Sequence, residues 1–136
     1  MANNAGRKIA LLVVLILQFL AVRSFAEVDD ANEAFSRGLE AYTDRRFIKA
    51  ADWYRKAVAL GHLGAPSFIG HLYVDGEGVA KNYVLAFMWY DIGAVNGFRD
   101  SKENRDRLGK MMTASEIEEA RKKAMICRNS NYSKCK

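Results

Sequence analysis

The feature that most constrains the fold of this sequence is an internal repeat with a period of thirty-six residues. Residues 50–54 read Ala-Ala-Asp-Trp-Tyr and residues 86–90 read Ala-Phe-Met-Trp-Tyr, and the two Trp-Tyr pairs contain the only two tryptophans of the chain. A glycine precedes each pair, Gly38 in the first unit and Gly70 in the second, which has four more residues in its middle. Because a unit this short cannot bury its own apolar face, the units are expected to stack on each other.

The elements of the repeat are predicted to be helices. After residue 27, apolar residues recur at intervals of three and four, without a sustained alternation of period two. Thr113 with Glu116 forms the pattern of a capping box, and Asp30 resembles another helix start. The only proline, Pro66, is tolerated in the first turn of a helix. The predicted helices lie near residues 31–43, 47–60, 66–75, 83–96, 98–111 and 114–127.

The repeat also predicts which positions hold the paired helices together. Small residues stand where two helices approach closely, and the bulky Trp and Tyr side chains fill the space beside them. We therefore expect Trp53 and Trp89 to be largely buried and equivalent. The repeat-defining residues are Gly38, Ala50, Trp53, Tyr54, Gly70, Gly76, Gly78, Ala86, Trp89 and Tyr90.

At these residues the chain resembles the Sel-one-like repeat family. Residues 65–97 contain the pattern Gly-x-Leu-Tyr-x-x-Gly-x-Gly-Val, beginning at Gly70, then Ala-x-x-Trp-Tyr and a final glycine. The first unit is more similar to the parent tetratricopeptide repeat, with Arg37 where the pattern has leucine, and residues 98–127 are similar to a two-helix cap. The resemblance implies a right-handed α-solenoid that binds other proteins and has no chemistry of its own.

The expected fold is therefore all-α, an α-solenoid of antiparallel helix hairpins with a two-helix cap at its C-terminal end. Residues 27–97 are expected to hold the two hairpin repeats, residues 98–128 the capping helices and residues 129–136 a basic tail.

Residues 1–26 have the pattern of a secretory signal peptide. Two basic residues precede an apolar run over residues 9–22, which only Gln18 interrupts, and Ser24 and Ala26 form a small-x-small site. The run is shorter than the roughly 20 residues that a membrane-spanning helix needs. We expect cleavage between Ala26 and Glu27 and a periplasmic or secreted protein. Because Arg23 separates the run from the site, an uncleaved anchor in the inner membrane remains the alternative.

The net charge of +5 is unevenly distributed along the chain. Residues 27–120 contain twelve basic and sixteen acidic residues, whereas residues 121–136 contain six basic residues and no acid. This distribution argues against nucleic acid as a partner, because a phosphate-binding face needs clustered cations on the folded body. The basic C-terminal end either complements the dipole of the last helix or makes a weak contact with an anionic membrane surface.

No catalytic residue, metal site or cofactor is predicted. His62 and His71 have no Cys, Asp or Glu neighbours at a metal-ligand spacing, and the Gly76 to Gly78 turn lacks the Lys-Ser or Lys-Thr of a phosphate-binding loop. Cys127 and Cys135 are expected to form a disulfide in an oxidising compartment, with two free thiols as the alternative.

The predicted function is that of a small exported adaptor for an unidentified protein partner, with a cell-envelope hydrolase or a self-associating structural component as alternatives. The resemblance implies that the first helix of each pair lines a concave binding face. Phe35, Leu39 and Tyr42 share one stripe of such a helix, as contacts or as core. The candidate binding residues are Asn32, Phe35, Leu39, Tyr42, Ser67, His71 and Val74.

Overall fold

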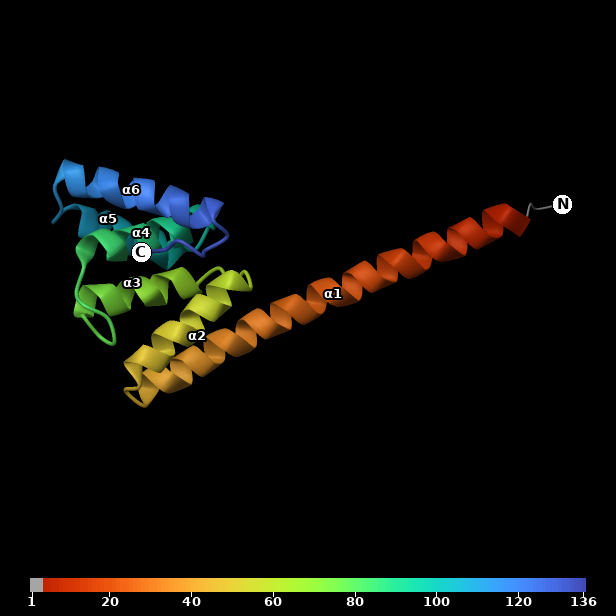
Figure 1. Cartoon of the computed structure of the whole chain (residues 1–136), viewed down its shortest axis with the longest axis horizontal. Coiled ribbons are helices and arrows are strands. Elements are labelled where there is room, and N and C mark those ends of the chain that lie inside the picture. Colours follow the sequence, from red (N-terminus) through yellow and green to blue (C-terminus); the bar gives the residue numbers. More distant parts are fainter. Residues whose placement is uncertain (1–3) are drawn as a thin grey trace.

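The computed structural model describes the backbone of residues 4–136 and the side chains of residues 6–19 and 30–136. Within these residues the chain forms six α-helices and no strand (Figure 1), which confirms the predicted all-α class. The helices are α1 (Asn4–Thr43), α2 (Phe47–Ala59), α3 (Ala65–Asp75), α4 (Tyr83–Val95), α5 (Arg99–Gly109) and α6 (Ala114–Asn129).

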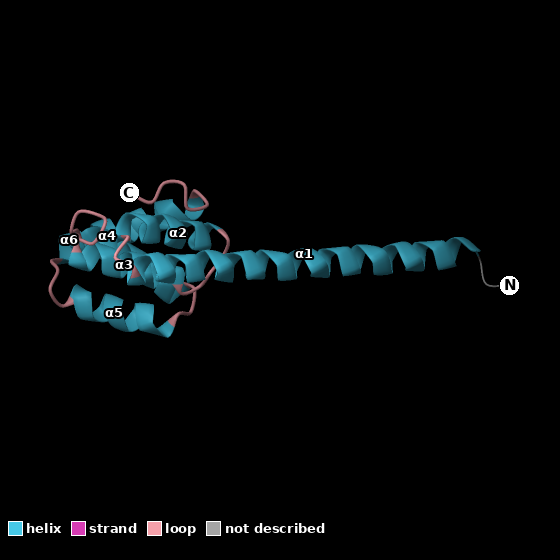
Figure 2. Cartoon of the chain, turned by 90° about the horizontal axis from the view of Figure 1, so that it is seen from below, coloured by secondary structure: helices cyan, strands magenta, loops and turns pink. Residues whose placement is uncertain are grey.

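The helices pack in the order expected of a solenoid. The C-terminal part of α1 pairs with α2, and α3 pairs with α4, while α2 contacts α3 and so joins the two hairpins. Both α5 and α6 pack against α4 and close the far end of the array. Figure 2 shows that the N-terminal half of α1 projects alone from this body, whereas the C-terminus lies against it.

Residues 4–43 form one continuous helix of 40 residues, α1, contrary to the expected helix start at residue 31. The predicted cap at Asp30 was therefore wrong, because Asp30 lies inside α1. No glycine or proline stands between residues 22 and 31 to interrupt the helix. The large apolar side chains described between Ile9 and Phe19 are exposed, with exposed fractions from 48% at Val13 to 70% at Phe19. Among the described residues, no helix combines the length and apolar character required to cross a bilayer.

The two repeat units share one packing contact between their helices. A Cβ atom added at Gly38 would lie 2.5 Å from the ring of Tyr54, and one added at Gly70 would lie 2.5 Å from the ring of Tyr90. Both tyrosine rings are buried against the backbone of the preceding helix. The equivalence of the two units is therefore visible in the same glycine and tyrosine contact.

The longer turn of the second unit follows α3 and rests on the start of α2. Gly76 and Gly78 both have positive φ, 73° and 70°, which a side chain would disfavour. A Cβ atom at Gly78 would lie 2.6 Å from the backbone carbonyl carbon of Phe47. The four extra residues thus connect the second hairpin to the first.

The tryptophans are not equivalent, contrary to the prediction. Trp89 is 1% exposed, and Tyr73 and Tyr132 border the same shallow hollow, so the C-terminal tail helps to cover it. Trp53 is only half-buried, with the Arg37 guanidinium 4.9 Å and the Lys56 amine 5.0 Å from its ring centre. Arg37 stands at the register position of the buried Ile69. Charged side chains therefore cover Trp53 at the end of the array formed by α1 and α2, where no further helix pair of the described residues packs.

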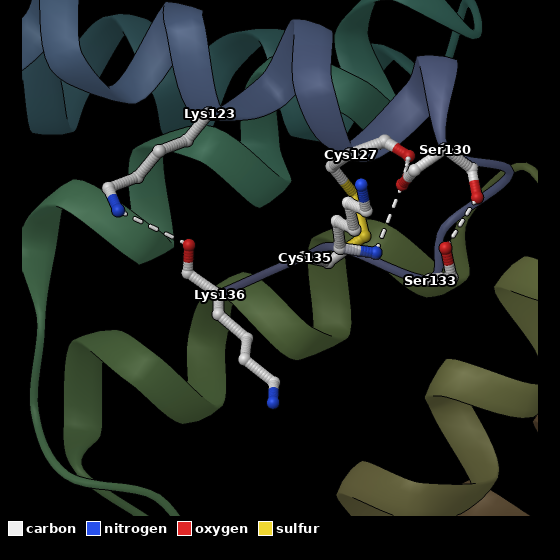
Figure 3. Close-up of a disulfide and its surroundings, with 7 residues drawn as sticks. Lys123, Cys127, Ser130, Ser133, Cys135 and Lys136 are labelled. Atoms are coloured by element: carbon white, nitrogen blue, oxygen red, sulfur yellow. Dashed lines mark hydrogen bonds between the residues drawn. A yellow bond between two sulfur atoms is a disulfide. The ribbon is translucent and has the colours of Figure 1, made fainter.

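The last helix and the tail are fixed by local bonds. The predicted capping box is present: the Thr113 hydroxyl accepts from Glu116 N–H at 3.2 Å, and Glu116 accepts from Thr113 N–H at 2.8 Å. Cys127 and Cys135 lie together with Cα atoms 4.6 Å apart and sulfur atoms at bonding distance (Figure 3). The Lys123 amine donates to the Lys136 carbonyl at 3.2 Å, so the tail folds back along α6.

Candidate protein-binding face

The first helices of the hairpins and of the cap present a continuous row of side chains, here called the inner face. Phe35 of α1 contacts Phe68 of α3 edge to face, with ring centres 4.8 Å apart. The ring centre of Phe68 lies 6.2 Å from that of His71, which is also on α3. The Nε2 atom of His71 is in turn 3.4 Å from the amide nitrogen of Asn104 on α5. The inner face consists of Phe35, Leu39, Tyr42, Phe68, His71 and Asn104.

Phe35 is a packing residue of this face. Its ring stacks on His62 with centres 4.0 Å apart and 14° between the planes, and it lies 5.7 Å from the ring of Tyr54. His62 is itself fixed, because its Nδ1 accepts from Ala65 N–H at 3.0 Å at the start of α3. Phe35 therefore helps to join the two hairpins. It is a core packing residue and not a free contact residue.

Leu39 and Tyr42 are the accessible residues of the predicted stripe. Each is 37% exposed, although each lies on the helix face that Phe35 shares. The Tyr42 ring packs edge to face on Phe47 at 5.2 Å. The pKa of Tyr42 is raised. The largest cause is a hydrogen bond between the neutral phenol and the neighbouring Glu77 carboxylate, and the second is burial of the phenol. Tyr42 therefore stays a protonated hydrogen-bond donor at the edge of an apolar surface.

The remaining candidates divide between surface and core. Asn32 is exposed and borders a shallow hollow with Leu63 and Phe98. Ser67 is 1% exposed, so its assignment to the binding face was wrong. Val74 is partly buried against the core. Helix α3 contacts α2, α4 and α5, whereas α1 lies at the end of the array, so equivalent register positions are covered more in the second unit.

Two inner-face residues, Phe68 and Asn104, were missed by the sequence analysis. Phe68 follows Ser67 directly in the sequence, so a predicted face placed one residue later on α3 would have included it. Asn104 lies in the cap, whose helix α5 contains almost no apolar residue and so gives no clear face from its pattern.

His71 on α3 contacts one side chain on each of the two helices α4 and α5. Its Nδ1 lies 3.0 Å from the Tyr90 hydroxyl, and its Nε2 accepts from the Asn104 amide at 3.4 Å. Burial is the main cause that lowers the pKa of His71, and burial likewise lowers the pKa of His62. Because both nitrogens of His71 are engaged, the ring serves as a link between α3, α4 and α5.

The surroundings show no arrangement typical of a metal site. In the part of the chain that the structure describes, no group of three His, Cys, Asp or Glu side chains could hold a metal ion. The inner face instead offers apolar surface, a phenol and an amide, which are groups that recognise another polypeptide.

No family model matches the chain. Two curated proteins are similar to about half of it. An exopolysaccharide production negative regulator of Rhizobium meliloti (strain 1021) is 34% identical over 70 residues, which are 52% of this chain and 26% of that protein. A protein of the same description from Rhizobium leguminosarum bv. viciae is 31% identical over 72 residues, 53% of this chain and 27% of its own length. The matched segment thus spans about a quarter of these relatives.

Proposed function

We propose that the protein is a small, non-catalytic adaptor of the cell envelope that binds another protein through its inner face. It is proposed to be a Sel-one-like repeat protein of the short exported type. The observation that carries the proposal is the pair Leu39 and Tyr42, each 37% exposed beside the rigid aromatic packing of Phe35, Phe68 and His62. Such preordered apolar surface loses little conformational entropy when a partner segment covers it.

The relatives suggest the process in which the adaptor acts. Both matching proteins are described as negative regulators of exopolysaccharide production. We propose by analogy that this chain also restrains polysaccharide output, by holding a partner in one state rather than by transforming a substrate. Deletion of the gene is expected to raise the secreted polysaccharide, measured as hexose equivalents per cell. The parent gene should restore the lower amount, and a Leu39→Ser, Tyr42→Ser gene should not.

The binding role is tested by crosslinking followed by affinity capture from an envelope extract. The double variant Leu39→Ser, Tyr42→Ser removes exposed apolar contacts, and Met125→Ser on α6 is a matched control because Met125 is 51% exposed. We expect the same partner to be recovered with the parent and with Met125→Ser, and to be lost with the double variant under conditions where circular dichroism shows that this variant is fully folded. Recovery of the same proteins by a folded double variant would contradict the proposal.

Export remains part of this proposal. The tripartite pattern of residues 1–26 supports cleavage between Ala26 and Glu27. The intact mass of protein recovered from the periplasm or the medium is expected to correspond to a chain that begins at Glu27. A full-length chain confined to the membrane fraction would establish the uncleaved anchor instead.

Self-association, hydrolysis and lipid contact each have a separate test. Self-association predicts a mass in sedimentation equilibrium that rises with protein concentration, whereas the adaptor proposal predicts a monomer. For a hydrolase, purified protein would turn over an envelope substrate, and that activity would have to survive the inner-face variants. Contact of the basic tail with lipid predicts co-sedimentation with anionic vesicles at low salt, and its loss after Lys134→Ala, Lys136→Ala.

A further inference from the structure

The turn between α1 and α2 departs from the way this chain ends its other helices. Arg46 N–H donates to the Ala41 carbonyl at 2.8 Å and Arg45 N–H donates to the Tyr42 carbonyl at 2.9 Å, the bond pattern of a Schellman motif. Arg45 occupies the left-handed position, with φ of 59°. Within the described residues, α2, α3, α4 and α6 have glycine or asparagine at this position, namely Gly61, Gly76, Gly97 and Asn131.

This choice of residue is unfavourable for folding alone. A left-handed backbone is readily adopted by glycine and by asparagine, whereas a long side chain makes it strained. Among the described residues, only Arg45 and Tyr132, which follows Asn131 after α6, are left-handed without being glycine or asparagine. A strained residue that persists on a surface points to a role for its side chain.

Arg45 belongs to a small surface that we call the turn patch. Its residues line one shallow hollow and are Arg45, Arg46, Phe47, Ile48, Lys49 and Gly78. Ile48 is 68% exposed in the middle of this surface, while Phe47 is half-buried and rests on Tyr42. The floor is rigid, because the backbone of Gly78 approaches Phe47 too closely to admit a side chain.

The turn patch has a charge of one sign. Three of its six residues are cations and none is an acid. Arg46 is neutralised by Asp44, whose carboxylate lies 2.7 Å from its guanidinium. Arg45 and Lys49 have no ion pair with any described residue. An exposed isoleucine is therefore flanked by two cations without an ion pair among the described residues, of which Lys49 also borders a hollow with Glu40 and Asp52.

We propose that the turn patch binds an extended acidic segment of a partner protein. An apolar side chain of that segment packs on Ile48 and Phe47, and its carboxylates pair with Arg45 and Lys49. The charge complementarity selects acidic sequences, and the apolar contact gives the segment its register. This surface adjoins the inner face through the contact of Phe47 with Tyr42 but shares no residue with it, and its role does not depend on the function proposed for that face.

A polypeptide fits the patch better than a lipid surface does. Ile48 is the only large apolar side chain of the patch that is strongly exposed, so little apolar area could enter a bilayer. The patch also lies at the opposite end of α1 from the exposed apolar residues 9–19 (Figure 1).

The test pans a random-peptide display library on the full chain and then measures the binding of a fluorescein-labelled copy of the enriched peptide by anisotropy. We expect Asp and Glu next to Leu, Ile or Phe in the enriched sequences. Arg45→Gly should weaken binding about tenfold, equivalent to about 1.4 kcal/mol. The same variant should melt at the same temperature or higher, because glycine relieves the backbone.

Two matched controls accompany this variant. Lys122→Ala removes an exposed cation on α6, and Ile126→Ser, at 50% exposure, matches Ile48→Ser. The α6 variants should bind the peptide as the parent does, and Ile48→Ser should bind it more weakly. Enrichment of non-acidic sequences, no enrichment, or unchanged affinity after Arg45→Gly overturns the proposal. It is equally overturned if Arg45 is needed for binding to phosphatidylglycerol vesicles but not to peptide.

Discussion

The two tryptophans allow the terminal repeat to be compared with the internal one in a single experiment. Trp89 is 1% exposed, so replacing it with Ala removes nearly all the apolar contact of the largest side chain in the core. A buried tryptophan covers about 200 Å², and about 25 cal/mol per Å² gives about 5 kcal/mol, close to the roughly 3 to 5 kcal/mol typical of such truncations.

Trp53→Ala should cost less free energy of unfolding than Trp89→Ala does. Trp53 is half-buried, and its ring is covered partly by the flexible side chains of Arg37 and Lys56. Because Trp53 buries somewhat less apolar area than Trp89 and gains only a weak cation–π contribution, we expect a cost of about 3 kcal/mol.

The two costs are measured by urea unfolding followed by far-ultraviolet circular dichroism, which does not depend on either indole as a probe. The free energies of unfolding of the parent and both variants can be compared directly when their m-values are equal. Equal costs for Trp53→Ala and Trp89→Ala would refute the argument that the open end of the array leaves its tryptophan partly uncovered. A larger cost for Trp53→Ala would refute it more strongly.

Three further predictions concern packing, protonation and the tail. Gly70→Ala should lower the free energy of unfolding by about 1 to 3 kcal/mol in urea titrations, because its Cβ would lie 2.5 Å from the Tyr90 ring; a cost near zero would contradict the close helix approach. In the folded chain, burial lowers the pKa values of His62 and His71 below the 6.5 of a free histidine. The unfolded chain therefore takes up protons at a higher pH than the folded chain does, and the free energy of unfolding should fall as the pH drops below about 6.5. This slope is measured by melts between pH 7 and 5, and it should flatten in the double variant His62→Asn, His71→Gln; an unchanged slope would assign it to other groups. Intact protein alkylated without reductant should gain no alkyl group at Cys127 or Cys135, whereas two added groups would show free thiols.

The sequence was sufficient to predict the fold because its signals are local and repeated. The glycine and tyrosine contacts and the capping box of Thr113 depend on spacing within one helix or between adjacent helices. The start of the first helix was predicted wrongly, because the Asp30 signal was weak and nothing before it breaks the helix.

The candidate site was only partly predictable, because exposure depends on which neighbours each helix has. Leu39 and Tyr42 are accessible because α1 lies at the end of the array, whereas Ser67, at the register position of Phe35, is covered by elements that pack on α3. The same difference separates Trp53 from Trp89. The link from His71 to Asn104 joins residues thirty-three positions apart, which no helical period could reveal.

The most direct test of the proposed adaptor role is site-specific photocrosslinking in living cells. p-Benzoylphenylalanine is placed at Leu39 on the inner face and, as a control of comparable accessibility, at Met125 on α6. We predict a discrete crosslinked band from position 39 that contains one partner protein, and no such band from position 125. The absence of a crosslink at position 39 in folded, exported protein, or the same band from both positions, would contradict the account.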